Sequence, residues 1–219
     1  MVTRKPFSEA QALELYRVAL ENAESQPQIA ATMAEFNYTA ETIAEGKNLL
    51  AQTRQAYNAN KTEDDETSAA YNDFNSKRTL LADTYALDRK KAKIIFRNDP
   101  LTLEKLGING SIPQAYVKWL ETTRKFYSVA IADTEIQAKL VRLKVTVEEL
   151  SAANTLITDT DAARVIYLRE KGESQDATQT KDAAFAAIDD WMSEFYAVAR
   201  IALEDNPQLL ETLGLLVRN

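Results

Sequence analysis

An internal repeat is the feature of this sequence that most constrains its fold. Residues 98–107 and residues 205–214 share Pro, Leu, Glu, Leu and Gly at the same spacing, 107 positions apart. The same offset pairs residues along the rest of the chain, and about twenty identities accumulate without a gap, roughly three times the number that chance gives. The sequence therefore predicts a tandem duplication, with residues 1–108 as the first copy and residues 109–219 as the second.

Both copies are predicted to be helical. The chain has only five Gly and five Pro among 219 residues, so turns are few and elements are long, which disfavours an all-β fold. Apolar residues recur at alternating spacings of three and four, the period of an amphipathic helix. We predict an all-α fold of two tandem helical bundles of similar fold, each with three main helices and a short terminal helix.

The first helix of each copy is predicted from its boundary residues. Ser8 with Gln11 forms a capping-box pattern at the start of the first copy. Pro27 should interrupt that helix, because proline lacks the amide hydrogen that a helix interior needs. Thr134 occupies the equivalent position in the second copy, so there we expect the helix to run unbroken to about Leu143.

Polar segments follow the second helix of each copy, at residues 58–66 and 169–176. We interpret both as hairpin turns to the third helix, because Asn58, Asn60 and Gly172 are typical of turns. The gapless repeat leaves an alternative, in which the second and third helices form one very long helix.

The third helix of each copy has two adjacent apolar stripes. In the first copy the second stripe contains Leu80, Thr84, Leu87 and Ile94. Two stripes make a wide apolar face that could contact two neighbours. We therefore expect this helix to be central in its bundle.

The missing residue types exclude several classes of chemistry. The chain has neither His nor Cys. This excludes Ser-His-Asp triads, cysteine nucleophiles, Fe–S clusters and His-ligated haem, as well as the Cys and His sites typical of zinc. We predict no cofactor. The formal net charge of −7 also argues against general nucleic-acid binding, which requires a basic surface.

The sequence predicts a cytoplasmic protein. No stretch approaches 18 uncharged apolar residues, so no membrane-spanning helix is expected. The N-terminus is basic, but Glu9, Glu14 and Arg17 interrupt the segment after it, so no signal-peptide core forms. A chain without Cys also suits a reducing compartment.

Three charged groups are candidate sites. The acidic run at residues 63–66 could bind Ca²⁺, but it lacks the spacing of an EF-hand loop, and we interpret it as a solvated turn. A basic cluster near the end of the third helix could bind an anion or a partner, although cations are also favourable at a helix C-terminus. It consists of Arg89, Lys90, Lys91, Lys93 and Arg97.

The third group is specific to the second copy and consists of Asp190, Trp191 and Glu194. Carboxylates beside an indole could carry out acid–base chemistry in a dry pocket. Asp189 precedes them, but adjacent helical residues diverge by about 100°, so Asp189 and Asp190 cannot easily share a site. Trp191 falls on an apolar stripe, which favours a core role.

The second copy also carries a resemblance. Residues 175–178, the run Asp189-Asp190-Trp191-Met192-Ser193-Glu194-Phe195 and residues 199–211 resemble a group of uncharacterised bacterial proteins of similar length. Those proteins also carry two copies that end in an Asp/Asn-Pro…Leu-Leu-Glu…Leu-Gly segment. The resemblance implies the duplicated helical architecture and a bacterial origin, and it implies no activity.

The most economical functional prediction is a non-enzymatic structural or protein-interaction module. It depends on the lack of a catalytic constellation and on the duplicated helical surfaces. Its expected partner is a protein or a second copy of the chain, with no nucleic acid and no membrane insertion. Two alternatives remain. One is a carrier of a small apolar ligand between the helices or at the junction of the two copies, suggested by the small residues Gly46 and Ala153 and by the aromatic-rich third helix. The other is an enzyme that uses only carboxylates with Lys or Arg.

Overall fold

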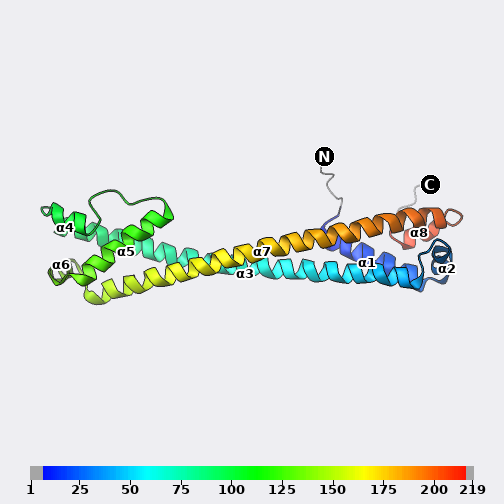
Figure 1. Ribbon diagram of the computed structural model, residues 1–219, viewed down its shortest axis with the longest axis horizontal. Coiled ribbons are helices and arrows are strands. Elements are labelled where there is room, and N and C mark those ends of the chain that lie inside the picture. Colours follow the sequence, from blue (N-terminus) through cyan, green and yellow to red (C-terminus); the bar gives the residue numbers. More distant parts are fainter. Residues whose placement is uncertain (1–6, 216–219) are drawn as a thin grey trace. The chain divides into compact units, whose positions relative to one another are not determined.

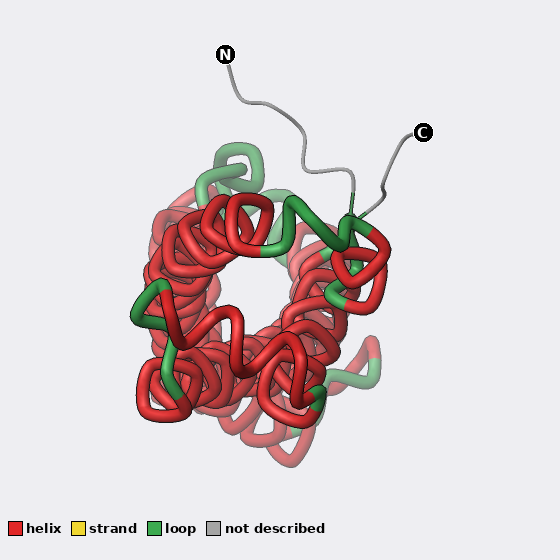
Figure 2. The backbone as a smooth tube through the Cα atoms, turned by 90° about the vertical axis from the view of Figure 1, so that its right-hand side faces the viewer, coloured by secondary structure: helices red, strands yellow, loops and turns green. Residues whose placement is uncertain are grey.

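The computed structural model describes residues 7–215, and they form helices joined by short loops. No strand occurs in this part of the chain, so the all-α prediction is confirmed there (Figures 1 and 2). The elements are α1 (Glu9–Ser25), α2 (Pro27–Glu35), α3 (Ala40–Ile95), α4 (Pro100–Lys105), α5 (Tyr116–Ala132), α6 (Thr134–Leu140), the 3-10 helix η1 (Val141–Leu143), α7 (Val147–Ala202) and α8 (Gln208–Thr212).

The helices α3 and α7 are each 56 residues long, so the predicted hairpin turns at residues 58–66 and 169–176 are wrong. The fused alternative is the one observed. Asn60 is buried, and its Nδ2 donates a hydrogen bond to Oγ1 of Thr178 at 3.1 Å, so its polarity serves a contact between helices. Gly172 lies inside α7, where a glycine costs only about 1 kcal/mol.

The chain divides into two compact units that do not follow the predicted copies. Unit 1 consists of Met1–Asp64 and Glu173–Asn219, and unit 2 consists of Asp65–Gly172. Unit 1 contains α1, α2, α8 and one part each of α3 and α7. Unit 2 contains α4, α5, α6, η1 and the other parts of α3 and α7 (Figure 1). The boundary predicted between residues 108 and 109 therefore falls inside unit 2.

Each unit has its own apolar core, and each core combines residues from both predicted copies. In unit 1, Leu13, Leu20 and Ile43 pack in one cluster with Ile188 and Phe195. In unit 2, the corresponding cluster includes Leu81, Tyr85, Leu120, Phe126 and Leu150. The first two helical segments of one copy are thus covered by the last two helical segments of the other.

The helix boundaries confirm part of the predicted capping. The capping box of Ser8 and Gln11 is present, and Pro27 begins α2 after α1 has ended at Ser25. The unbroken helix predicted to reach about Leu143 is wrong, because α5 ends at Ala132. Asp133 causes this break, since its carboxylate accepts hydrogen bonds from the amides of Glu135 and Ile136 and caps α6.

The helix bounds recur at the offset found in the sequence. That offset relates both ends of α1 to both ends of α5, and both ends of α3 to both ends of α7. Gly107 and Gly214 both have a positive φ, as do Asn37 and Lys144. These four residues end helical segments in the left-handed conformation that favours Gly and Asn.

Among the described helices, none combines the length and the apolar composition required to cross a membrane.

Candidate functional site

The second apolar stripe of α3 is exposed in unit 2. The exposed fractions are 58% for Leu80, 54% for Leu87 and 53% for Ile94. The expectation that this stripe contacts a second helix of its own bundle is therefore wrong. We call these three residues the apolar stripe. They are seven residues apart, so they line up along one side of the helix.

Exposed apolar side chains are concentrated in unit 2. Among the described residues, thirteen large apolar side chains are exposed in unit 2 and three in unit 1. The two units have nearly the same number of residues, so size does not explain this difference. Single exposed apolar residues are ordinary, but an ordered row of them indicates an interaction surface.

A groove of about 520 Å³ lies beside the apolar stripe, between α3 and α7. Most of its lining side chains are small or apolar, and two are carboxylates. Thr84 keeps the groove open because its side chain is short and its hydroxyl donates to the carbonyl oxygen of Leu80 in its own helix, at 2.8 Å. The lining residues are Leu80, Thr84, Glu149, Ala152, Ala153, Thr155, Leu156 and Asp159.

In unit 1 a tryptophan occupies the position that corresponds to Thr84 in the repeat. This residue, Trp191, stacks on Phe195 with ring centroids 5.6 Å apart and meets the edge of Tyr38. Its indole also packs directly against Gly46, where a Cβ would lie 2.5 Å from Cη2. The space that is an open groove in unit 2 is thus filled by an indole in unit 1.

The three residues of the candidate group Asp190, Trp191 and Glu194 lie in different surroundings. Trp191 has a packing role, and Asp190 is exposed. Glu194 lies near Tyr38, whose pKa is raised to about 12 by burial and by that carboxylate. Asp189 faces a different direction from Asp190, as expected, and accepts a hydrogen bond from the hydroxyl of Tyr16 at 2.7 Å.

The basic cluster mainly holds the loop after α4. Arg89 donates to the carbonyl oxygens of Ile108 and Gly110, and Lys93 donates to that of Gly110. Lys91 donates to the carbonyl oxygen of Lys144 and lies 3.6 Å from Asp88. These contacts give three of the five residues a structural role.

The other two residues of the cluster, Lys90 and Arg97, are exposed. Arg97 and Arg142 line a hollow of about 270 Å³, and Ile94 and Leu143 form part of the same wall. The end of the apolar stripe at Ile94 is therefore flanked by basic side chains.

A buried pair in unit 2, Asp88 and Tyr127, is not among the candidate sites predicted from the sequence. The hydroxyl of Tyr127 donates to Oδ2 of Asp88 at 3.0 Å, and both side chains are buried. Burial raises the pKa of Asp88, while the bond from Tyr127 and the charge of Lys91 oppose that rise. Asp88 shares the three-and-four spacing of Leu81, Tyr85 and Ala92, which predicts the core-facing stripe of this helix. A carboxylate is unusual on such a stripe, and this is the signal in the sequence.

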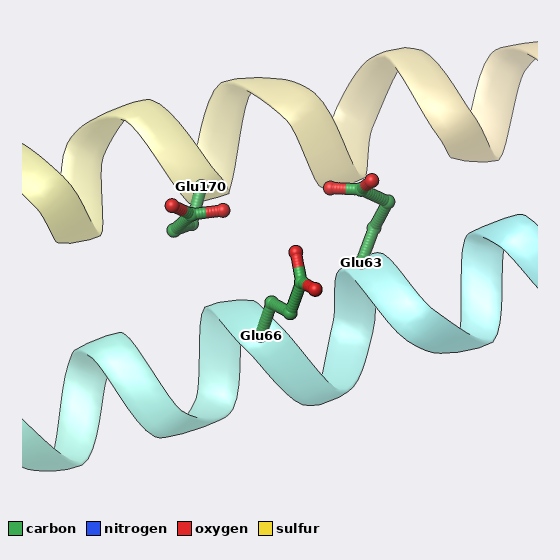
Figure 3. Close-up of side chains that lie close together, drawn as sticks. All are labelled: Glu63, Glu66 and Glu170. Atoms are coloured by element: carbon green, nitrogen blue, oxygen red, sulfur yellow. The ribbon is translucent and has the colours of Figure 1, made fainter.

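The acidic run belongs to helix α3 and is not a solvated turn. Figure 3 shows Glu63 and Glu66 one turn apart on α3, and Glu170 on α7. Glu63 belongs to unit 1, whereas Glu66 and Glu170 belong to unit 2. Because acidic side chains commonly gather without an ion, we assign no metal to this set.

Unit 1 contains an apolar pocket of about 340 Å³ between α1, α7 and the end of α8. Tyr16 and Asp189, which share a hydrogen bond, form part of its wall. Tyr196 also lines it, and burial raises the pKa of this phenol to about 12. Its other lining residues are Phe7, Ala12, Leu15, Gly214 and Leu215.

No family model matches this chain, and no significant match was found among curated proteins or solved structures.

Proposed function

We propose that this protein is a non-enzymatic helical module that acts by docking to another protein surface. The docking face consists of the apolar stripe, Leu80, Leu87 and Ile94, together with the groove beside it. The observation that carries the proposal is the exposure of three large apolar side chains at a spacing of seven residues. Burying such a row would gain roughly 25 cal/mol for each Å² of apolar surface removed from water.

The contrast between the two units supports this assignment. Leu87 in unit 2 corresponds to Glu194 in unit 1, and Thr84 corresponds to Trp191. In unit 1, a charged side chain and a filled groove suit a surface that faces water. In unit 2, a leucine and an open groove suit a surface that another protein covers. Unit 1 therefore serves as an internal reference for unit 2.

We also propose that the two copies arose by tandem duplication at the offset found in the sequence. The gapless identities and the recurring helix bounds support it. A bacterial, cytoplasmic protein that works without a cofactor remains part of the same proposal. The absence of Cys and the acidic composition are compatible with it.

Photo-cross-linking in the native cell tests the docking proposal. A benzophenone side chain at position 87 should give covalent adducts with a protein, because the partner covers Leu87. The matched control carries the same side chain at the exposed position 194, where we expect few adducts. An absence of protein adducts at position 87, with the probe fully incorporated, would remove the proposal.

A second candidate function, a carrier of a small apolar ligand, is favoured by the pocket in unit 1. Its volume of about 340 Å³ and its apolar wall suit a ligand of modest size. Leu15→Trp should fill the pocket. If the pocket is a ligand site, this variant should lose the binding of a fluorescent apolar probe while keeping its helical circular dichroism. Equal probe binding by the variant and the wild type would count against a carrier.

A further inference from the structure

The two ends of the docking face on unit 2 carry opposite charges. The groove is lined by two carboxylates of α7: Glu149, whose charge acts on Asp88 beside Leu87, and Asp159, which lies ten residues farther along α7 toward Leu80. The hollow at the Ile94 end is lined by Arg97 and Arg142. Leu80 and Ile94 are 14 residues apart on α3, which corresponds to roughly 21 Å of helix. The face is therefore apolar along its length, acidic toward one end and basic at the other.

We infer that the occupant of this face is a second copy of the chain, which binds in the antiparallel direction about a two-fold axis near Leu87. This inference rests on the proposed docking function and names its partner. Any face that is acidic at one end and basic at the other complements a second copy of itself that runs in the reverse direction. A two-fold dimer uses the same patch on both subunits, and a patch with this charge pattern meets that requirement.

The spacing of the apolar stripe fits the same arrangement. With the axis near Leu87, the two copies of Leu87 meet each other, and Leu80 of each copy meets Ile94 of the other. A repeat of seven residues keeps an apolar row facing its partner along the whole contact, as in a coiled coil. The acidic rim at Asp159 would then lie opposite Arg142 of the second copy, so the polar rim pairs as well.

A single substitution tests the apolar part of this dimer. Sedimentation velocity of the full chain should show a reversible dimer with a dissociation constant on the order of 1–100 μM. Leu87→Glu should weaken association by about a hundredfold, because a two-fold dimer contains the substitution twice and each anchor is worth on the order of tenfold. The fold should tolerate this change, since Glu194 occupies the equivalent position in unit 1.

The matched control is Ile201→Glu on unit 1. Ile201 is 59% exposed and corresponds to Ile94, so the exchange of an apolar side chain for a carboxylate is comparable. Because Ile201 lies outside the docking face, this variant should sediment like the wild type. An equal loss of association in both variants would show that the docking face has no specific role, and would overturn the inference.

Charge reversal tests the direction of pairing. Arg142→Glu places a carboxylate opposite Asp159 of the second copy, and Asp159→Arg places a guanidinium opposite Arg142 of the second copy. Each variant alone should therefore associate at least tenfold more weakly than the wild type. An equimolar mixture should form a heterodimer, because both contacts between positions 142 and 159 in it join opposite charges. Association of either variant unchanged from the wild type, or no recovery in the mixture, would contradict the antiparallel arrangement.

Failure of this inference can be distinguished from failure of the docking proposal. A chain that stays monomeric at about 1 mM, with position 87 cross-linked only to a different protein in the cell, would overturn the self-association and keep the docking face. A monomeric chain with no adducts at position 87 would overturn both.

Discussion

At the scale of single residues, the contact between Gly46 and Trp191 distinguishes the two units. A Cβ at position 46 would lie 2.5 to 2.8 Å from three carbon atoms of the indole ring. We expect Gly46→Ala to destabilise the protein, since overpacking typically costs about 1–3 kcal/mol and outweighs the gain in helix propensity of about 1 kcal/mol. Urea unfolding of the variant measures the change in the free energy of unfolding.

Two matched variants isolate the cause of that effect. Gly172→Ala, in open space within α7, should stabilise the chain by up to about 1 kcal/mol. In a Trp191→Ala background, Gly46→Ala should raise the free energy of unfolding, because the indole that would clash with the new Cβ is then absent. The same destabilisation by Gly46→Ala in both backgrounds would show that Trp191 does not occupy the space beside Gly46.

The buried pair of Asp88 and Tyr127 predicts a pH dependence. Because burial raises the pKa of Asp88 above its ordinary value of 3.8, the folded chain holds this proton more firmly than the unfolded chain does. The contribution of Asp88 to the free energy of unfolding is therefore fully present below pH 3.8, and it is lost as the pH rises through the raised pKa of the folded chain. The free energy of unfolding of the wild type, relative to Asp88→Asn, should fall as the pH rises from 3.8 toward 7.

The Asp88→Asn variant is the right reference for this measurement. Asn keeps an oxygen that can accept the hydrogen bond from Tyr127 but cannot ionise. Groups that titrate equally in both proteins cancel in the difference between them. A difference that is constant from pH 3.8 to 7, or that grows in favour of the wild type, would contradict the assignment of a raised pKa to Asp88.

Among the secondary-structure elements, α3 and α7 differ most from the prediction, because each is one continuous helix where a turn was expected. Asn58, Asn60 and Gly172 are poor helix formers, and that made a turn the preferred interpretation. Asn60 instead serves a buried contact with Thr178, and the segment 58–66 contains no Pro or Gly that would end a helix. The gapless repeat was the better signal, because loops tolerate insertions and helices do not.

Hydrogen exchange tests this continuity directly. Amides in residues 58–66 and 169–176 should be protected to the same degree as their neighbours in α3 and α7, since each donates within an unbroken helix. The loop at residues 109–115, which precedes α5, provides an exchanging reference in the same experiment. Exchange of residues 58–66 as fast as that loop would contradict a continuous α3.

For the complete fold, the sequence predicts the helices better than it predicts which helices pack together. Periodicity identifies the face of each helix that must be covered, and it does so correctly for Leu81, Tyr85 and Ala92. It does not identify which helix covers that face. Because the two predicted copies have equivalent apolar patterns, that pattern is equally compatible with a third helix that covers the first two helices of its own copy or of the other copy.

The same limit explains why the sequence does not predict the exposure of the apolar stripe. The stripe of Leu80, Leu87 and Ile94 has the periodicity of a buried surface, so the sequence predicts its burial and cannot tell a core from an interface. Its identification needed the exposed fractions together with the contrast to Trp191 and Glu194 in unit 1.

The division of the chain into two units that each combine both copies is tested most directly by expression of fragments. Residues 65–172 contain the complete core of unit 2, so this fragment should fold alone, with cooperative thermal unfolding and native-like near-ultraviolet circular dichroism. Residues 1–108 contain only parts of both cores and should not fold as a monomer. A cooperatively folded monomer of residues 1–108, together with an unfolded fragment 65–172, would contradict this division.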